Sequence, residues 1–333
     1  MERKSFIQSI FGAGALLSIP FCTDSIDTEE INLQIKNSSK KCNGSMIGFR
    51  VEPISKVKIG LIGIGNRGKT LIQMLDLLLE EKKAEVVALG DLDKKYYKNQ
   101  WRIKHHVERN GNFYPTHGIG PVSFYMNIGR GDTFKYLTSM SSKEQSLSLA
   151  VEKTKSNFPK IKCGDVNTSL IKTELGRTIM VQWDETSPRP YSRHNLIQGT
   201  QGTLAGFPTR VAFDNESNIK NNISDESVDY HSWIQGKDLE KLYEKYDHPL
   251  YIRLGNLAKK MGGHGGMDFI MRYRIIECLR EGLPLDQNVY EGCFWSAVGP
   301  LSGKSVKEDG LPQKFPDFTR GNWKSTKPLD IIS

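Results

Sequence analysis

The feature that most constrains the fold of this chain is a glycine motif that follows one apolar run and precedes another. Val57–Ile62 is an apolar, β-branched run of strand length, and Gly63–Gly68 reads G-x-G-x-x-G. From Thr70 to Lys82, leucines and isoleucines recur at helical spacing. A second strand follows over Glu85–Asp91 and ends in an acid about 20 residues past the motif. This order of elements is typical of a dinucleotide-binding unit.

The glycines and the acid indicate which dinucleotide would bind. Glycines allow a tight turn, so a pyrophosphate can approach the N-terminus of the following helix. The carboxylate of Asp91 would hold the ribose hydroxyls, which favours NAD over NADP. The motif alone leaves one alternative open, a glycine turn in another kind of strand–helix–strand unit.

The unit lacks the second half of a dinucleotide-binding fold, which normally has two βαβαβ halves. After Asp93 the sequence turns polar, and no further strand–helix alternation precedes the segment that begins at Trp101. A two-stranded remnant would leave strand edges unpaired, so we expect it to pair with the C-terminal sheet or with another subunit. The chain of 333 residues has room for about two domains.

The rest of the chain has the pattern of an α+β domain. Apolar positions at helical spacing predict a helix over Met267–Glu281, preceded by a glycine-rich loop, Gly262–Gly266. The loop's amides could hold an anion or hydroxyls, or its glycines could let helix and sheet pack closely. We therefore predict an α/β protein, with a truncated Rossmann-type unit at 57–95 and an α+β substrate domain at 96–333. The sheet of that domain is expected to be largely antiparallel, from short runs at Ser169–Thr173, Thr178–Trp183, Asn195–Gly199 and Thr203–Phe207.

Histidines and tyrosines gather in the segment from Trp101 to Val122. Tyr114 and His117 stand three residues apart on a turn that contains proline and glycine, so a phenol and an imidazole can converge on one substrate and move protons. A structural role for His117 stays open. His105 and His106 lack a third ligand at useful spacing, so we expect no metal site. We assign them to a helix face or to positions that support the site from behind the residues that contact the substrate.

The motifs together resemble those of glycoside hydrolase family 109. The resemblance rests on the strand–GIGNRG–helix opening, on WRIKHHVERNGNFYPTHGIGP, SPRPYSR, EKYDHPLY and GHGGMDF, and on the closing FPDFTRGNWK. It extends from Val57 to Lys324 and implies an NAD-dependent α-N-acetylgalactosaminidase of the glucose–fructose oxidoreductase/inositol dehydrogenase superfamily. Against the family pattern, about a hundred residues are missing after Asp93, which indicates an internal deletion.

The resemblance implies hydrolysis by a redox-neutral, NAD-dependent elimination and addition with retention, rather than by a carboxylate pair. It assigns proton transfer to Tyr114 and His117, and orientation of the sugar to Arg102 and Tyr191. It gives no role to His264 and Asp268, and no residue is assigned to a metal. The implied substrate-binding residues are Arg102, Tyr114, Pro115, Thr116, His117 and Tyr191, and the cofactor-binding residues are Gly63, Gly65, Asn66, Arg67, Gly68 and Asp91.

The N-terminus predicts export. Arg3 and Lys4 precede an apolar run that continues to Phe21, which is typical of an export signal over residues 1–22, followed by a polar linker at 23–56. A buried first helix is the alternative. Cys22 is a candidate for lipid attachment, so we expect the protein in the periplasm or cell envelope. The remaining cysteines have no metal-binding spacing, and one disulfide among them stays open, although four cysteines do not make a disulfide scaffold.

The composition and the motifs indicate which binding partners to expect. The net charge is +8, but basic and acidic residues are interleaved, so we expect no nucleic-acid partner. The expected partner is a glycan with terminal N-acetylgalactosamine, and the protein is a candidate homo-oligomer. Two other functions stay open: a sugar oxidoreductase of the same superfamily, and a non-catalytic remnant that has lost NAD binding.

Overall fold

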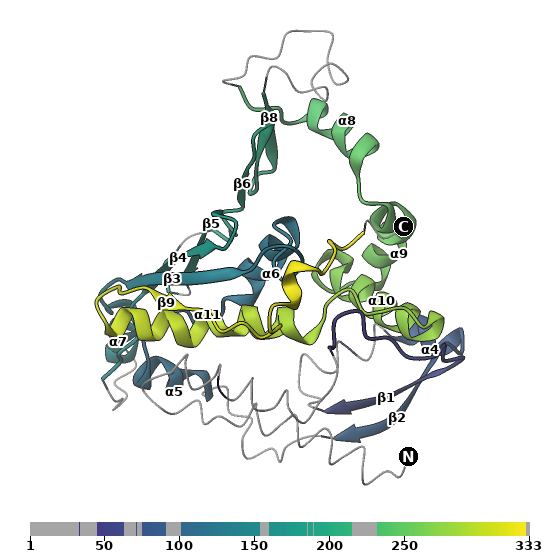
Figure 1. Cartoon of the computed structure of the whole chain (residues 1–333), viewed down its shortest axis with the longest axis horizontal. Coiled ribbons are helices and arrows are strands. Elements are labelled where there is room, and N and C mark those ends of the chain that lie inside the picture. Colours follow the sequence, from purple (N-terminus) through teal and green to yellow (C-terminus); the bar gives the residue numbers. More distant parts are fainter. Residues whose placement is uncertain are drawn as a thin grey trace.

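The structure is a computed structural model, shown in Figure 1. It describes residues 33, 45–62, 71, 75–90, 101–153, 160–184, 186–188, 190–214 and 232–330. The expected export signal with Cys22, most of the expected linker, the glycine motif and Asp91 lie outside these residues. Of the helices that the structure describes, none has the length and apolarity needed to span a membrane.

The N-terminal unit contains the expected parallel strand pair. β1 (Val57–Ile62) pairs in parallel with β2 (Ala84–Gly90), and α4 (Asp76–Glu80) lies between them in the sequence. The register joins the last residues of the two strands, so both end at the same edge. The helix expected over Thr70–Lys82 is confirmed over Asp76–Glu80, whereas Glu81 and Lys82 form a turn instead of the expected last helical residues. In the described part of the chain these two strands pair with each other and not with the C-terminal sheet.

A helix from the C-terminal part of the chain covers this unit. Val57, Leu78 and Ala84 form a buried cluster with Ile276 of α10 (Met267–Glu281), whose bounds are those expected from the sequence. The end of the expected linker also contacts α10, because the amide of Ile54 donates to the carbonyl of Leu279 at 3.1 Å. Burial of apolar side chains against α10 therefore stabilises a unit whose described part contains two strands.

The main sheet is antiparallel and supports the candidate site. Its order is β5 (Thr178–Asp184), β4 (Val166–Thr173), β3 (Phe134–Ser141) and β9 (Gln313–Lys314). Buried and exposed residues alternate along β5, as expected for a sheet with one covered face. On that face α6 (Thr116–Tyr125) packs on β5 and α11 (Val289–Lys307) packs on β3 (Figure 1). The core between them includes Leu137, Ile171, Val181, Phe294 and Val298.

The expectation of one antiparallel sheet is wrong in one respect. The runs expected at Asn195–Gly199 and Thr203–Phe207 form β6 (Leu196–Gln198) and β7 (Gly202–Ala205), which pair with β8 (Arg210–Phe213) in a second sheet. The segment between β5 and β6 contains two prolines, which cannot donate ladder hydrogen bonds. The chain therefore leaves the first sheet there. In Figure 1 the second sheet extends away from the main one.

The remaining helices complete the described part of the fold. α11 begins with a capping box, in which the side chain of Asn288 accepts from two backbone amides and Glu291 bonds back to the amide of Asn288. The described cysteines, Cys163, Cys278 and Cys293, form no disulfide. The other helices are α5 (Trp101–Glu108), α7 (Ser146–Lys153), α8 (Lys237–Tyr246), α9 (Pro249–Met261), η3 (His264–Gly266) and η4 (Asn322–Lys324).

Candidate functional site

The candidate proton-transfer residues lie at the start of α6 rather than on a turn. Pro115 is the N-cap, with φ −73°, and its carbonyl accepts from the amides of Gly118 at 3.1 Å and Ile119 at 2.9 Å. His117 therefore belongs to the first helical turn, which corrects the expectation of a turn. Proline suits a helix start because its fixed φ is helical and no amide donor is needed there. The proline that indicated a loop in the sequence instead begins a helix.

Tyr114 and His117 are held together on the surface. Their rings stack with centroids 4.5 Å apart and an interplanar angle of 27°, and Tyr114 Oη lies 3.4 Å from His117 Nε2. Both side chains are exposed. The base beneath them is rigid, because the amide of Tyr114 donates to Asn112 Oδ1 and the fully buried Asn112 donates its own amide to Ser302 Oγ of α11. A phenol and an imidazole so placed can both donate and accept protons toward a bound molecule.

The other expected substrate residues lie on three different segments of the chain. Tyr191 lies in the loop between β5 and β6, where its Oη accepts from Arg193 Nε at 2.8 Å and its ring packs edge-on against Phe207. Pro115 is buried and Thr116 is half-buried, next to the Tyr114–His117 pair. The backbone of Arg102 is in α5, but its side chain lies outside the described part.

The assignment of His105 and His106 to a helix face is confirmed. Both lie on α5, and His106 is buried against the rings of Phe113 and Trp183. Burial lowers the pKa of His105, and the nearby charge of Arg109 lowers it further. In the part of the chain that the structure describes, no three or more His, Cys, Asp or Glu residues are grouped so that they could hold a metal.

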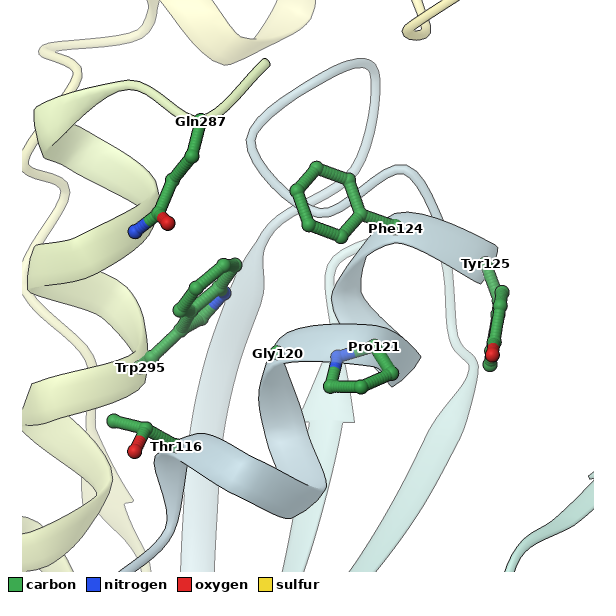
Figure 2. A pocket seen from close by; sticks show the side chains of 7 residues that line it. All are labelled: Thr116, Gly120, Pro121, Phe124, Tyr125, Gln287 and Trp295. Atoms are coloured by element: carbon green, nitrogen blue, oxygen red, sulfur yellow. The ribbon is translucent and has the colours of Figure 1, made fainter. Parts of the chain in front are cut away.

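A pocket of about 420 Å³ lies beside the Tyr114–His117 segment and was not expected from the sequence. Figure 2 shows it between α6 and the start of α11, with the ring of Trp295 facing α6. The signal that could have indicated it is the spacing of His117, Gly120, Pro121 and Phe124, because residues 3, 4 and 7 apart share one helix face. The lining residues are Thr116, Gly120, Pro121, Phe124, Tyr125, Gln287 and Trp295.

Close packing explains one glycine of the loop before α10. A Cβ on Gly266 would lie 2.7 Å from the carbonyl carbon of Ala258, so this glycine lets η3 approach α9. The packing is against a helix, whereas the sequence suggested packing against a sheet. His264 Nδ1 lies 2.8 Å from Asp268 Oδ2, across the start of α10. The Asp268 carboxylate is largely buried and positions the exposed His264 ring.

The parallel strand pair and the antiparallel sheet define an α/β protein with a Rossmann-type strand pair at its N-terminal end. Residues 77–325 match the family described as Glycosyl hydrolase 109, C-terminal domain. The chain therefore belongs to glycosyl hydrolase family 109. The matched range contains Tyr114, His117, Tyr191 and the pocket, and it begins after the glycine motif.

Two curated relatives of family 109 show how much of their length the chain matches. The Glycosyl hydrolase family 109 protein 1 of Akkermansia muciniphila is 57% identical over 242 residues, which cover 70% of this chain and 48% of that protein. The Glycosyl hydrolase family 109 protein of Shewanella amazonensis is 53% identical over 252 residues, covering 73% and 52%. The chain thus spans about half the length of the curated relatives it matches.

Two solved structures resemble the chain more distantly. Levoglucosan dehydrogenase in complex with NADH and levoglucosan has a TM-score of 0.45 and 10% identity, covering 78% of this chain and 99% of that chain. An NAD binding oxidoreductase from Klebsiella pneumoniae has a TM-score of 0.47 and 10% identity, with the same coverage.

Proposed function

We propose that this protein is an NAD-dependent glycosidase that removes terminal α-N-acetylgalactosamine with retention of anomeric configuration. The observation that carries the proposal is the pairing of Tyr114 and His117 at the start of α6, inside the segment that matches family 109. A stacked phenol and imidazole, exposed on a rigid base, supply two proton-transfer groups on one side of a bound sugar.

The cofactor would be held at the edge where β1 and β2 end. Their parallel register ends with Ile62 opposite Gly90, and the chain continues from these residues into the glycine motif and into Asp91. This topology fits a dinucleotide site. When bound there, NAD supplies reversible hydride transfer. The residues that would hold it are Gly63, Gly65, Asn66, Arg67, Gly68 and Asp91.

The remaining roles concern this chain's own side chains. Tyr114 Oη and His117 Nε2 would hold and return the protons that the reaction removes from the sugar and gives to the leaving group. Arg102 and Tyr191 would orient the sugar by hydrogen bonds, together with Thr116. Export by residues 1–22, with the protein acting in the periplasm or envelope on exposed glycans, is part of the same proposal, as is assembly into a homo-oligomer.

The test combines a cofactor measurement with an activity measurement. The full chain is purified, denatured and assayed for released NAD, and a native sample is incubated with p-nitrophenyl α-N-acetylgalactosaminide. Bound NAD together with p-nitrophenol release is the expected result. Accumulation of NADH when free sugar is added would favour the oxidoreductase alternative. Neither NAD nor turnover, while the Akkermansia muciniphila relative shows both, would establish a non-catalytic remnant.

A further inference from the structure

We propose that the pocket between α6 and α11 binds the second sugar unit of the glycan, the one to which the terminal sugar is attached. The inference rests on the proposed function, because it takes the terminal sugar to lie at Tyr114 and His117. It adds a subsite whose lining is not part of the expected substrate-binding set except for Thr116.

The first argument is continuity along one helix face. His117, Gly120, Pro121 and Phe124 are spaced so that they lie on the same side of α6. Ile119 is fully buried on the opposite side, in the main core. A molecule bound at His117 that extends along this face by one helical turn therefore reaches the pocket.

The second argument is the chemistry of the lining. Trp295 and Phe124 pack edge to face with centroids 5.7 Å apart, so the two rings form one continuous aromatic wall of the pocket. Figure 2 shows that Trp295 comes from α11 and Phe124 from α6. Aromatic rings contact the C–H faces of a pyranose, and the Gln287 amide and Thr116 hydroxyl can bond to its hydroxyls. None of the lining residues carries a charge, so the pocket suits a neutral ligand better than a phosphate or an acidic peptide.

The third argument is size and shape. The pocket has about 420 Å³ and opens broadly to solvent, and its volume lies within the range of about 300–1,000 Å³ that is common for small-molecule sites. A Cβ on Gly120 would make ordinary contact with Trp295 at 3.4 Å, so the ring packs directly on α6 and a longer side chain at this position would displace it. The pocket therefore has room for a sugar ring, with Tyr125 exposed at its rim.

The experiment compares two sugar ligands on the full chain. N-acetylgalactosamine fills the first site alone, and a sulfur-linked disaccharide of N-acetylgalactosamine and galactose, which resists hydrolysis, fills both. Binding is measured by calorimetry, and the indole signal of Trp295 is followed by NMR after assignment with Trp295→Phe. We expect the disaccharide to bind about fivefold more tightly, the gain from one or two added hydrogen bonds. Only the disaccharide should shift the Trp295 signal.

Matched variants assign the preference to the pocket. Gln287→Ala and Tyr125→Ala change exposed side chains, so both should fold, and both should reduce the ratio of disaccharide to monosaccharide affinity toward one. Gln145→Ala, just before α7, and Tyr243→Ala, on α8, remove the same residue types at exposed positions away from the pocket and should keep the wild-type ratio.

The outcomes separate the subsite from the proposed function. Equal affinity for the two ligands, with monosaccharide binding lost in His117→Ala, would overturn the subsite and leave the function standing. A disaccharide preference that survives both pocket variants would also overturn it, and would leave the pocket to a segment of this chain or a second copy. If neither sugar binds, both proposals fail.

Discussion

The ring of Tyr114 stacks on the ring of His117, with Tyr114 Oη 3.4 Å from His117 Nε2. Pro115 between them is the N-cap of α6, so Tyr114 precedes the helix and His117 lies in its first turn, and their side chains contact each other. Each ring therefore limits the orientation of the other. If these are the proton-transfer groups, removing either ring changes the chemistry and also the placement of the remaining one.

Replacement of His117 by Ala should abolish turnover without unfolding the protein. Loss of a proton-transfer group costs about 10²–10⁴ in rate, whereas an exposed substitution changes stability by about 0.5 kcal/mol or less. Tyr114→Phe keeps the stack and removes the hydroxyl, so it should lose activity while bound NAD stays unchanged. The checks are p-nitrophenol release, NAD content and thermal unfolding. Retained turnover in His117→Ala would refute its role, and Tyr243→Phe is the control.

Gly266→Ala should destabilise the protein more than Gly265→Ala does. Both glycines have positive φ, 102° and 70°, so each variant bears a backbone cost. Only at Gly266 would the new methyl meet Ala258, whereas the Cβ at Gly265 would meet nothing within 4 Å. The added overpacking cost is about 1–3 kcal/mol. Urea unfolding of the two variants measures the difference, and equal stabilities would show that the contact at Gly266 relaxes freely.

Glu291→Gln should lower the free energy of unfolding by about 2–4 kcal/mol, because it leaves the Arg130 guanidinium without its buried partner. Arg130 Nε lies 2.7 Å from Glu291 Oε1, and the Glu291 side chain is 2% exposed. The same carboxylate accepts from the amide of Asn288 and completes the cap of α11. Glu240→Gln, an exposed change in the first turn of α8, should have little effect in the same denaturant titration. A loss under 1 kcal/mol for Glu291→Gln would contradict the expectation.

The elements with strong local periodicity were predictable, and those defined by distant contacts were not. β1 and α10 have the bounds that their apolar spacing indicates. β3 was missed although it is central to the main sheet, since its sequence FKYLTSMS mixes polar residues that are buried only by packing under α11. Ser139 of β3 is one such residue, and its amide donates to Ser305 Oγ of α11.

The residues of the candidate site were predictable from local sequence, whereas its conformation and its pocket were not. The segment Tyr114–His117 was found from residue types, but its helical conformation was not, because Pro115 reads equally as a turn signal and a helix start. The pocket beside it depends on Trp295 and Gln287, which are about 170 residues away in sequence, and no local pattern joins them to α6.

Glu277 should make stability depend on pH in the acid range. Burial by itself would raise the pKa of this carboxyl, but hydrogen bonds from Arg253 and Arg274 outweigh burial and lower the pKa. Arg253 Nη1 lies 3.0 Å from Glu277 Oε1, and Arg274 bonds the other oxygen. A carboxyl whose pKa is lower in the folded state stabilises the fold above its unfolded pKa, about 4.3, and loses that contribution as the pH falls through the folded value.

Glu277→Gln should therefore cost about 1–2 kcal/mol at pH 7, a value reduced because Arg253 is partly exposed to solvent. The cost should shrink as the pH falls from about 4.3 through the lower pKa of the folded state, where the wild-type carboxyl becomes protonated and loses the same interaction. Glu281→Gln, an exposed change at the end of α10, is the matched control and should leave the profile unchanged. The measurement is the denaturant midpoint of both variants and the wild type between pH 3 and pH 7. A penalty for Glu277→Gln that stays constant over this range would contradict the expectation, because it would show that the carboxylate charge is not the source of the lost stability.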